Sequence, residues 1–283
     1  MPFRPLLGTV TTLKVRRFGP PGAFLEIPTE DARGNVPVVL IPNAEVPKGL
    51  REGDTLDVFI HLDSEDRPIA TMRQPKMQLG EVAFVEVTDT PPIGAFVDWG
   101  LVKNLLVPFA EQTKPLVKGE RHPIGLFVDS SSRLAGTMRV SELLKTTGEF
   151  ELDEWVEGEA WRKEPELGVF VIVERRFVGL LPAHEPNTLS RGDAGKFRVT
   201  HIHTDGKIEL SLRGQALDEL ANDASRILTA LSSPTPPTLG DKSSPEDILR
   251  VFGLSKKAFK RAVGSLLKQG LVSIDRGIVT KKR

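Results

Sequence analysis

Residues 94–99 read GAFVDW, and this run, in which glycine, alanine or valine, phenylalanine and an aliphatic residue follow one another, occurs three times in the chain. GAFLEI occupies 22–27 and GVFVIV occupies 168–173. Each copy follows a strand candidate that begins at a glycine, namely Gly8, Gly80 and Gly158. Self-similarity of this kind is the signature of a repeated structural unit. The sequence therefore predicts three copies of one small fold.

The segments after each motif recur in the same order. A strand candidate with a proline near its end comes next, at 38–43, 105–110 and 179–184. Turn-led strand candidates follow at 52–60, 118–128 and 191–202, and closing strands at 67–73, 133–139 and 207–213. Five short segments with Gly, Asp and Pro between them, over roughly 60 to 70 residues, predict a small five-stranded β-barrel rather than a helical repeat.

Composition fits a folded chain of several small domains. The protein has 283 residues, a formal net charge of zero, 39% hydrophobic residues and 27% charged residues. Cysteine is absent, which excludes disulfides, cysteine nucleophiles and thiolate metal sites. No segment approaches the ~20 apolar residues that a membrane helix needs, and the N-terminus lacks the apolar core of a signal peptide. We expect a cytoplasmic protein without membrane contact.

The C-terminal part has a different period. Apolar residues at helical spacing predict a helix over 215–233, and a proline-rich joint follows it. Ser244 and Ser255 are expected N-caps of two further helices, and residues 271–280 predict a hairpin around an Asp-Arg-Gly turn. Three helices followed by a hairpin is the order of a winged helix.

These observations predict a multidomain, mainly β protein, in which three small five-stranded β-barrels are followed by an α+β winged-helix domain. The expected domains cover 1–76, 77–143, 144–214 and 215–283.

The three copies resemble S1-type RNA-binding domains of the OB-fold class. Their strand ending in a Gly-Ala-Phe-Val-like run and the closing GKIELSLR at 206–213 carry this resemblance. With the C-terminal segment included, the chain resembles the bacterial conserved virulence factor B family over almost its whole length. The most specific matches are 94–112 and 241–272. The resemblance implies an RNA-binding protein that influences gene expression.

Side-chain alternation along the strand at 94–99 divides it into two faces. We expect Ala95, Val97 and Trp99 to face the barrel core, and Phe96 and Asp98 to face outward.

The same alternation of side chains along the motif strand predicts that Phe24 and Phe170 face outward in the other copies. An exposed ring on an OB-fold face can stack a base, which contributes ~1–3 kcal/mol per base. The alternative is that Phe24, Phe96 and Phe170 pack between neighbouring barrels. Ile172, which lies outward beside Phe170, favours packing in the third copy.

The resemblance to S1 domains would also place a second aromatic residue before the motif glycine and a histidine on the next strand. The place of the second aromatic residue is occupied by Pro21, Ile93 and Leu167. The place of the histidine is occupied by proline or by a residue next to it. A face with one ring should bind single-stranded RNA more weakly, although linkage of several barrels compensates through effective concentration.

Basic residues recur near the end of each copy, as Arg67 and Arg73, Arg133 and Arg139, and Lys207 and Arg213. In S1 domains an Asp and an Arg four residues apart lie beside the binding face. Asp63 with Arg67 and Asp129 with Arg133 keep this spacing. We expect the recurrent bases to contact nucleic acid, and the alternative is ordinary solvated charge.

The segment from Asp241 to the C-terminus has eleven basic and four acidic residues, a net charge of plus seven. On its third helix, Phe259, Val263, Leu266 and Leu267 form the expected buried stripe. The adjacent flank has five basic residues: Lys256, Lys257, Lys260, Arg261 and Lys268. Such a flank is suited to a phosphate backbone, as in helix-turn-helix docking, although it could also be solvated or contact a protein.

The sequence contains no phosphate loop, Ser-His-Asp order or paired-carboxylate motif, and no set of three metal ligands at recognisable spacing. We therefore expect a non-enzymatic protein without a cofactor or metal that binds single-stranded or looped RNA. Two alternatives remain: a transcription regulator that binds duplex DNA through its winged helix, and an adaptor that contacts the ribosome or protein partners.

Overall fold

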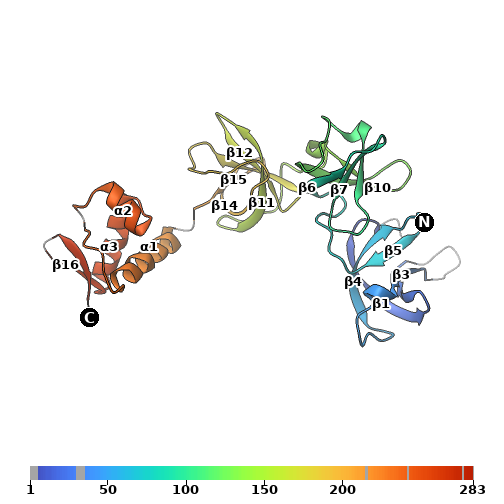
Figure 1. Ribbon diagram of the computed structural model, residues 1–283, viewed down its shortest axis with the longest axis horizontal. Coiled ribbons are helices and arrows are strands. Elements are labelled where there is room, and N and C mark those ends of the chain that lie inside the picture. Colours follow the sequence, from blue (N-terminus) through green and yellow to red (C-terminus); the bar gives the residue numbers. More distant parts are fainter. Residues whose placement is uncertain (1–5, 30–35, 214–215, 241, 276, 283) are drawn as a thin grey trace. The chain divides into compact units, whose positions relative to one another are not determined.

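The computed structural model describes residues 6–29, 36–213, 216–240, 242–275 and 277–282, without the side chains of 216–219. The chain divides into two compact units, Met1–Leu210 and Ser211–Arg283. The first unit holds three five-stranded repeats and the second holds three helices and a hairpin (Figure 1). The prediction of a mainly β chain with a C-terminal winged helix is confirmed. None of the helices in the described part of the chain is long and apolar enough to cross a membrane.

The strands of the first repeat are β1 (Val10–Gly19), β2 (Gly22–Glu26), β3 (Val38–Pro42), β4 (Thr55–Leu62) and β5 (Pro68–Thr71). Those of the second repeat are β6 (Val82–Asp89), β7 (Gly94–Asp98), β8 (Leu105–Pro108), β9 (Arg121–Val128) and β10 (Leu134–Thr137). Those of the third repeat are β11 (Trp155–Glu164), β12 (Gly168–Val173), β13 (Phe177–Pro182), β14 (Ala194–Ile202) and β15 (Ile208–Ser211). A short 3-10 helix follows β3, β8 and β10, at Asn43–Glu45, Phe109–Glu111 and Val140–Glu142.

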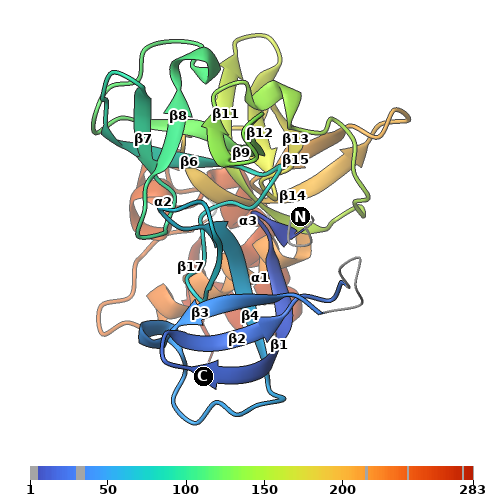
Figure 2. The ribbon, with the colours of Figure 1, turned by 90° about the vertical axis from the view of Figure 1, so that its right-hand side faces the viewer.

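The repeats differ in how they close. The first and third repeats are closed barrels, in which the third and fifth strands form a short parallel pair, Leu40 with Ile69 and Leu180 with Glu209. The second repeat has the strand order β10-β9-β6-β7-β8, with β7 and β8 side by side in Figure 2. Among the described residues, β8 and β10 form no pair. We call the line between these two strands the open seam.

The motif glycine permits a close approach of two strands. Gly22, Gly94 and Gly168 have φ values of 151°, 149° and 128°, where side chains are rarely tolerated. A Cβ on Gly94 would lie 2.4 Å from the carbonyl oxygen of Val107 on β8, and the other two glycines have even closer carbonyl neighbours. The recurrence of glycine at the start of the motif follows from this backbone contact.

The two faces of the motif strand are as predicted. Ala95, Val97 and Trp99 are buried in the core of the second repeat, and Phe96 and Asp98 are half-buried on the other face.

Phe59 forms the joint between the first and second repeats. This β4 residue is 1% exposed and belongs to the apolar cluster of the second repeat. Its ring meets Trp99 edge to face, with the ring centroids 5.7 Å apart. Lys76, just before β6, adds a backbone bond of 2.7 Å to the Trp99 carbonyl and an ion pair of 2.5 Å to Asp98. The Lys76 ammonium lowers the pKa of Asp98 by hydrogen bonding to the carboxylate.

Phe84 and Ile172 form the joint between the second and third repeats. Both are buried in one apolar cluster with Val82, and the Phe84 amide donates to Glu159 of β11. An ion pair of 2.9 Å between Arg176 and Glu81 flanks the cluster. Ile172 packs between barrels, but Phe170 beside it, for which Ile172 favoured the same role, is not part of this cluster.

The second unit consists of α1 (Ala216–Leu231), α2 (Pro245–Phe252), α3 (Lys256–Lys268), β16 (Val272–Asp275) and β17 (Ile278–Lys281). Both predicted N-caps are confirmed, because Ser244 accepts from the Asp247 amide at 3.1 Å and Ser255 from the Ala258 amide at 3.2 Å. Arg276, within the predicted turn, lies outside the described residues.

The predicted buried stripe of α3 is wrong at one end. Phe259, Val263 and Leu266 are buried, but Leu267 is 38% exposed and Ala262 is fully buried instead. At 100° per residue, Leu267 lies at the edge of a stripe centred between Phe259 and Leu266, whereas Ala262 lies inside it.

Candidate nucleic-acid interface

The three motif phenylalanines occupy the same place in their repeats, and all are half-buried. Each ring has a register partner on the first strand of its own repeat: Arg17 opposite Phe24, Asp89 opposite Phe96 and Arg162 opposite Phe170. The Arg17 guanidinium carbon lies 3.7 Å from the Phe24 ring centroid, and that of Arg162 lies 4.7 Å from the Phe170 centroid. A guanidinium group over a ring is a cation–π contact that covers the ring.

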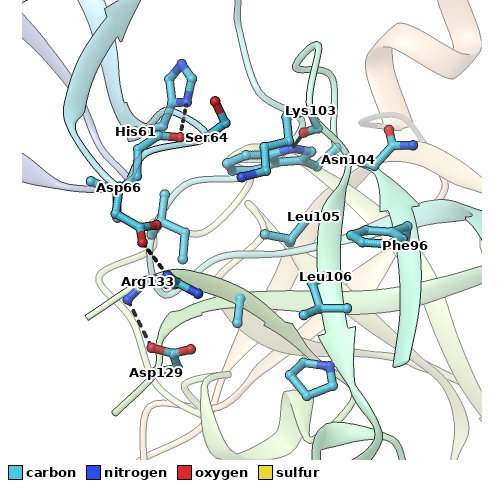
Figure 3. Close-up of a pocket in the computed structure, with 15 residues that line it drawn as sticks. His61, Ser64, Asp66, Phe96, Lys103, Asn104, Leu105, Leu106, Asp129 and Arg133 are labelled. Carbon is cyan, nitrogen blue, oxygen red and sulfur yellow. Dashed lines mark hydrogen bonds and ion pairs between the residues drawn. The ribbon is translucent and has the colours of Figure 1, made fainter. Parts of the chain in front are cut away.

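Phe96 instead lines a pocket of about 310 Å³ (Figure 3). Residues of the open seam line it from both strands: Leu105, Leu106 and Pro108 of β8, and Leu134 and Ala135 of β10. The loop between β7 and β8 adds Lys103 and Asn104. Its volume is at the lower end of the ~300–1,000 Å³ range of small-ligand pockets.

The first repeat forms the remaining wall of the pocket. His61, Ser64 and Asp66, from the end of β4 and the turn after it, face the second repeat there. Burial lowers the pKa of His61, so this side chain is neutral at pH 7 and leaves the positive charge of the pocket to Lys103 and Arg133.

Arg133 forms its side-chain ion pair with Asp66 of the first repeat. The Asp129 carboxylate, four residues before Arg133, instead accepts the backbone amides of Ser131 and Arg133, at 2.8 and 3.0 Å. The corresponding side chains of the first repeat, Arg67 and Asp63, do pair, at 2.8 Å. The backbone amide of Arg67 also lowers the pKa of Asp63 by donating to its carboxylate. Both arginines follow an aspartate by four residues, but their ion-pair partners differ. Arg133 pairs with an acid of another repeat, whereas Arg67 pairs with an acid of its own repeat.

The other recurrent bases also contact groups of the protein. Arg73 pairs with Glu45 at 3.4 Å, Arg139 with Glu111 at 3.9 Å, and Lys207 with Asp205 at 2.7 Å. The Arg213 amide donates to the Ser211 hydroxyl at 3.0 Å. Arg73 and Arg139 thereby link the end of their repeats to the 3-10 helix after the third strand. A phosphate would have to compete with these carboxylates.

The basic flank of α3 divides into two sets. Lys256 donates to the Ser243 carbonyl at 2.9 Å, and Arg261 lies 3.8 Å from Asp223 of α1. Lys257, Lys260 and Lys268 are exposed. Arg261 is exposed as well, so these three lysines and Arg261 are the bases of the helix that face solvent.

Sequence reasoning missed Asp66, Lys103, Asn104 and Leu106 as pocket residues. Lys103 and Asn104 had one local signal, their position between the second and third strands of the repeat, whose face is a binding surface of OB folds. No local pattern could indicate Asp66, because its contribution depends on how two repeats pack together.

Two family models match the chain: an S1 domain over residues 7–73 and a CvfB-like winged helix domain over residues 237–280. These domain types support a nucleic-acid-binding role. The chain is 33% identical over 261 residues to the uncharacterized protein YitL of Bacillus subtilis, covering 87% of this chain and 86% of that protein. It is 26% identical to conserved virulence factor B of Staphylococcus aureus, over 82% of this chain and 80% of that protein. A crystal structure of a Streptococcus pneumoniae multidomain protein with nucleic acid binding domains covers 98% of this chain and 99% of its own, at 25% identity and a TM-score of 0.41.

Proposed function

Because the chain belongs to the family of conserved virulence factor B and YitL, we propose that it binds RNA and regulates gene expression after transcription, without catalysing a reaction. Its S1 and winged-helix domains are of nucleic-acid-binding types. Single-stranded or looped RNA is the proposed ligand, since only unpaired bases can stack on a protein ring.

The observation that carries this proposal is the Phe96 pocket. An aromatic ring, an apolar floor at Leu106 and two cationic side chains, Lys103 and Arg133, line one cavity. Stacking surfaces combined with positive charge are what proteins use to hold single strands. Phe24 and Phe170 occupy the same register in the other repeats and extend the proposed path, each beneath an arginine that would have to move or join the stack.

Parallel titrations of the full chain with a labelled single-stranded RNA and a labelled DNA duplex, at several salt concentrations, test the proposal. We expect the RNA to bind more tightly at each concentration. Tighter binding of the duplex would favour a DNA-binding regulator that uses α3. Binding of neither at moderate salt would favour an adaptor with protein partners.

Neutralising the exposed lysines of α3 is expected to reduce the salt dependence of RNA binding. Each phosphate contact contributes ~0.7 to the slope of log K against log salt for a single strand, so changing Lys257, Lys260 and Lys268 together to glutamine should lower the slope by about 2. Arg250→Gln on α2, which removes an exposed base that pairs with Asp247 at 2.6 Å, is the control and should leave the slope unchanged. Equal slopes for the triple variant and the unmodified protein would exclude α3 from the RNA contact.

A further inference from the structure

The three S1-like repeats are not equivalent as binding sites for a nucleotide base. Arginine covers the motif ring in the first and third repeats, at 3.7 and 4.7 Å from the ring centroid. In the second repeat the register partner of the ring is Asp89, which has no group that could stack on Phe96. Phe96 therefore faces a cavity, while Phe24 and Phe170 face a side chain of their own repeat.

Residues of the open seam form one wall of this cavity. Leu106 and Ala135 correspond in sequence to the paired Leu40 and Ile69 of the first repeat, but both line the pocket instead of joining β8 to β10. A base that enters beside Phe96 would thus meet apolar side chains below it as well as a ring beside it. Apolar lining with a few convergent polar groups is the usual form of a ligand site.

The first repeat completes the cavity on the side opposite Phe96. In Figure 3, Asp66 and Arg133 lie together on one side and Phe96 lies on the other. Phe59 and Trp99, through their edge-to-face contact at the joint, fix the first repeat against the second. The pocket is therefore a property of two consecutive repeats, and an isolated second repeat would lack one wall.

The side chains that line this pocket include both positive and negative charges, namely Lys103, Arg133 and Asp66. Lys103 is exposed, and no acid among the described residues pairs with it. The guanidinium group of Arg133 is held by Asp66, with side-chain exposures of 59% and 44%. An exposed pair of this kind is weak, so a phosphate can compete for Arg133. Once Arg133 turned to a phosphate, the Asp66 carboxylate would be left facing an anion.

We propose that this pocket binds one nucleotide of single-stranded RNA, with its base against Phe96 and Leu106 and its phosphate at Lys103 and Arg133, and that Asp66 weakens this binding by pairing with Arg133. The inference rests on the proposed function, and it assigns the principal base site to the second repeat. Phe24 and Phe170 are secondary, because a base must first displace an arginine.

Single substitutions of the three rings test the unequal roles. Binding of a labelled single-stranded RNA of about 12 nucleotides, within the usual site sizes, is measured by fluorescence anisotropy. We expect Phe96→Ala to weaken binding about 5- to 150-fold, the range that corresponds to loss of one stacked base. The matched controls Phe24→Ala and Phe170→Ala, at the same register, should each weaken it less than about threefold.

The outcomes separate this inference from the proposed function. Equal losses for the three variants, or no loss for Phe96→Ala while the unmodified protein binds RNA, would overturn the inference and leave the proposed function standing. Failure of the unmodified protein to bind RNA would overturn both. Circular dichroism and thermal unfolding of each variant verify that a loss of binding is not a loss of fold.

Replacing Asp66 tests the opposing role of its carboxylate. Asp66→Asn is expected to strengthen binding of the same RNA about two- to fivefold, because it frees Arg133 and removes a negative charge. Asparagine also tolerates the φ of 60° at this position. Glu65→Gln is the matched control: it removes the same charge from the same turn, but its carboxylate pairs with Arg67 at 2.8 Å. Weaker binding by Asp66→Asn, or an equal gain from Glu65→Gln, would contradict the proposed competition for Arg133.

Discussion

Replacing Gly94 by alanine is expected to destabilise the second repeat by at least about 3 kcal/mol. The added Cβ would lie 2.4 Å from the Val107 carbonyl oxygen, and the φ of 149° is one that residues with a side chain rarely adopt. The strand must therefore move away from β8, which breaks the pairing of Gly94 with Pro108 and of Ala95 with Val107. Because Phe96 follows two residues later, the pocket would be distorted as well.

Gly119→Ala is the matched control for this substitution. Gly119 also has a positive φ, 86°, but nothing lies within 4 Å of the position of its Cβ. Only backbone strain of about 1–2 kcal/mol is then expected. Urea unfolding of both variants gives the two free energies, and hydrogen exchange of peptides that cover β7 and β8 locates the change. Similar losses in the free energy of unfolding for the two variants would show that the close approach of β7 to β8 is not the reason why the motif requires glycine.

Replacing Phe59 by alanine is expected to lower the stability of the first unit by about 3–5 kcal/mol. Phe59 is one of the largest fully buried side chains and packs among residues of the second repeat. Its removal leaves a cavity next to Trp99, whose ring it meets edge to face. The repeats would then be held less firmly, and the wall of the pocket that comes from the first repeat would lose its support.

Trp99 fluorescence during urea unfolding reports on this joint when Trp155 and Trp161 are replaced by phenylalanine in every variant, because a ring newly exposed to water emits at longer wavelength. Phe109→Ala serves as the control: Phe109 is 59% exposed, so its loss should cost less than about 0.5 kcal/mol. If Phe59→Ala were as stable as this control, the joint would have to depend on its backbone and ion-pair contacts rather than on the buried ring.

Local patterns were sufficient to predict the repeats, the faces of the motif strand and the helix caps. Alternation placed Ala95 and Val97 inside because a barrel strand has one buried face. Ser244 and Ser255 were recognisable because an N-cap is a contact within a few residues.

The joints between repeats were harder to predict, because they depend on packing between distant segments. Packing at the joints was the alternative role of Phe24, Phe96 and Phe170, but the buried phenylalanines there are Phe59, which meets Trp99, and Phe84. A signal for both was present in the uninterrupted apolar runs at 58–60 and 82–85, which lack the alternation of a half-exposed strand. Such runs indicate that both faces of a strand are buried, and here the second face is covered by the next repeat.

The partners of charged residues were not predictable from spacing. Arg133 and Arg67 each follow an aspartate by four residues, yet only Arg133 pairs with an acid of another repeat. Likewise, Arg17, Asp89 and Arg162 occupy one register position, and it is the residue type there that decides whether the opposite ring is covered.

The open seam also has a consequence for how the chain avoids self-association. Among the described residues, β8 and β10 face each other without forming a ladder, and unpaired strand edges are templates for pairing with other chains. Both strands are only four residues long, and the Gln112 side chain occupies the Val107 carbonyl at 3.0 Å. The turn at 63–66 faces the same seam across the pocket. The first repeat therefore covers part of this seam within the same chain and leaves less of it open to pairing with another chain.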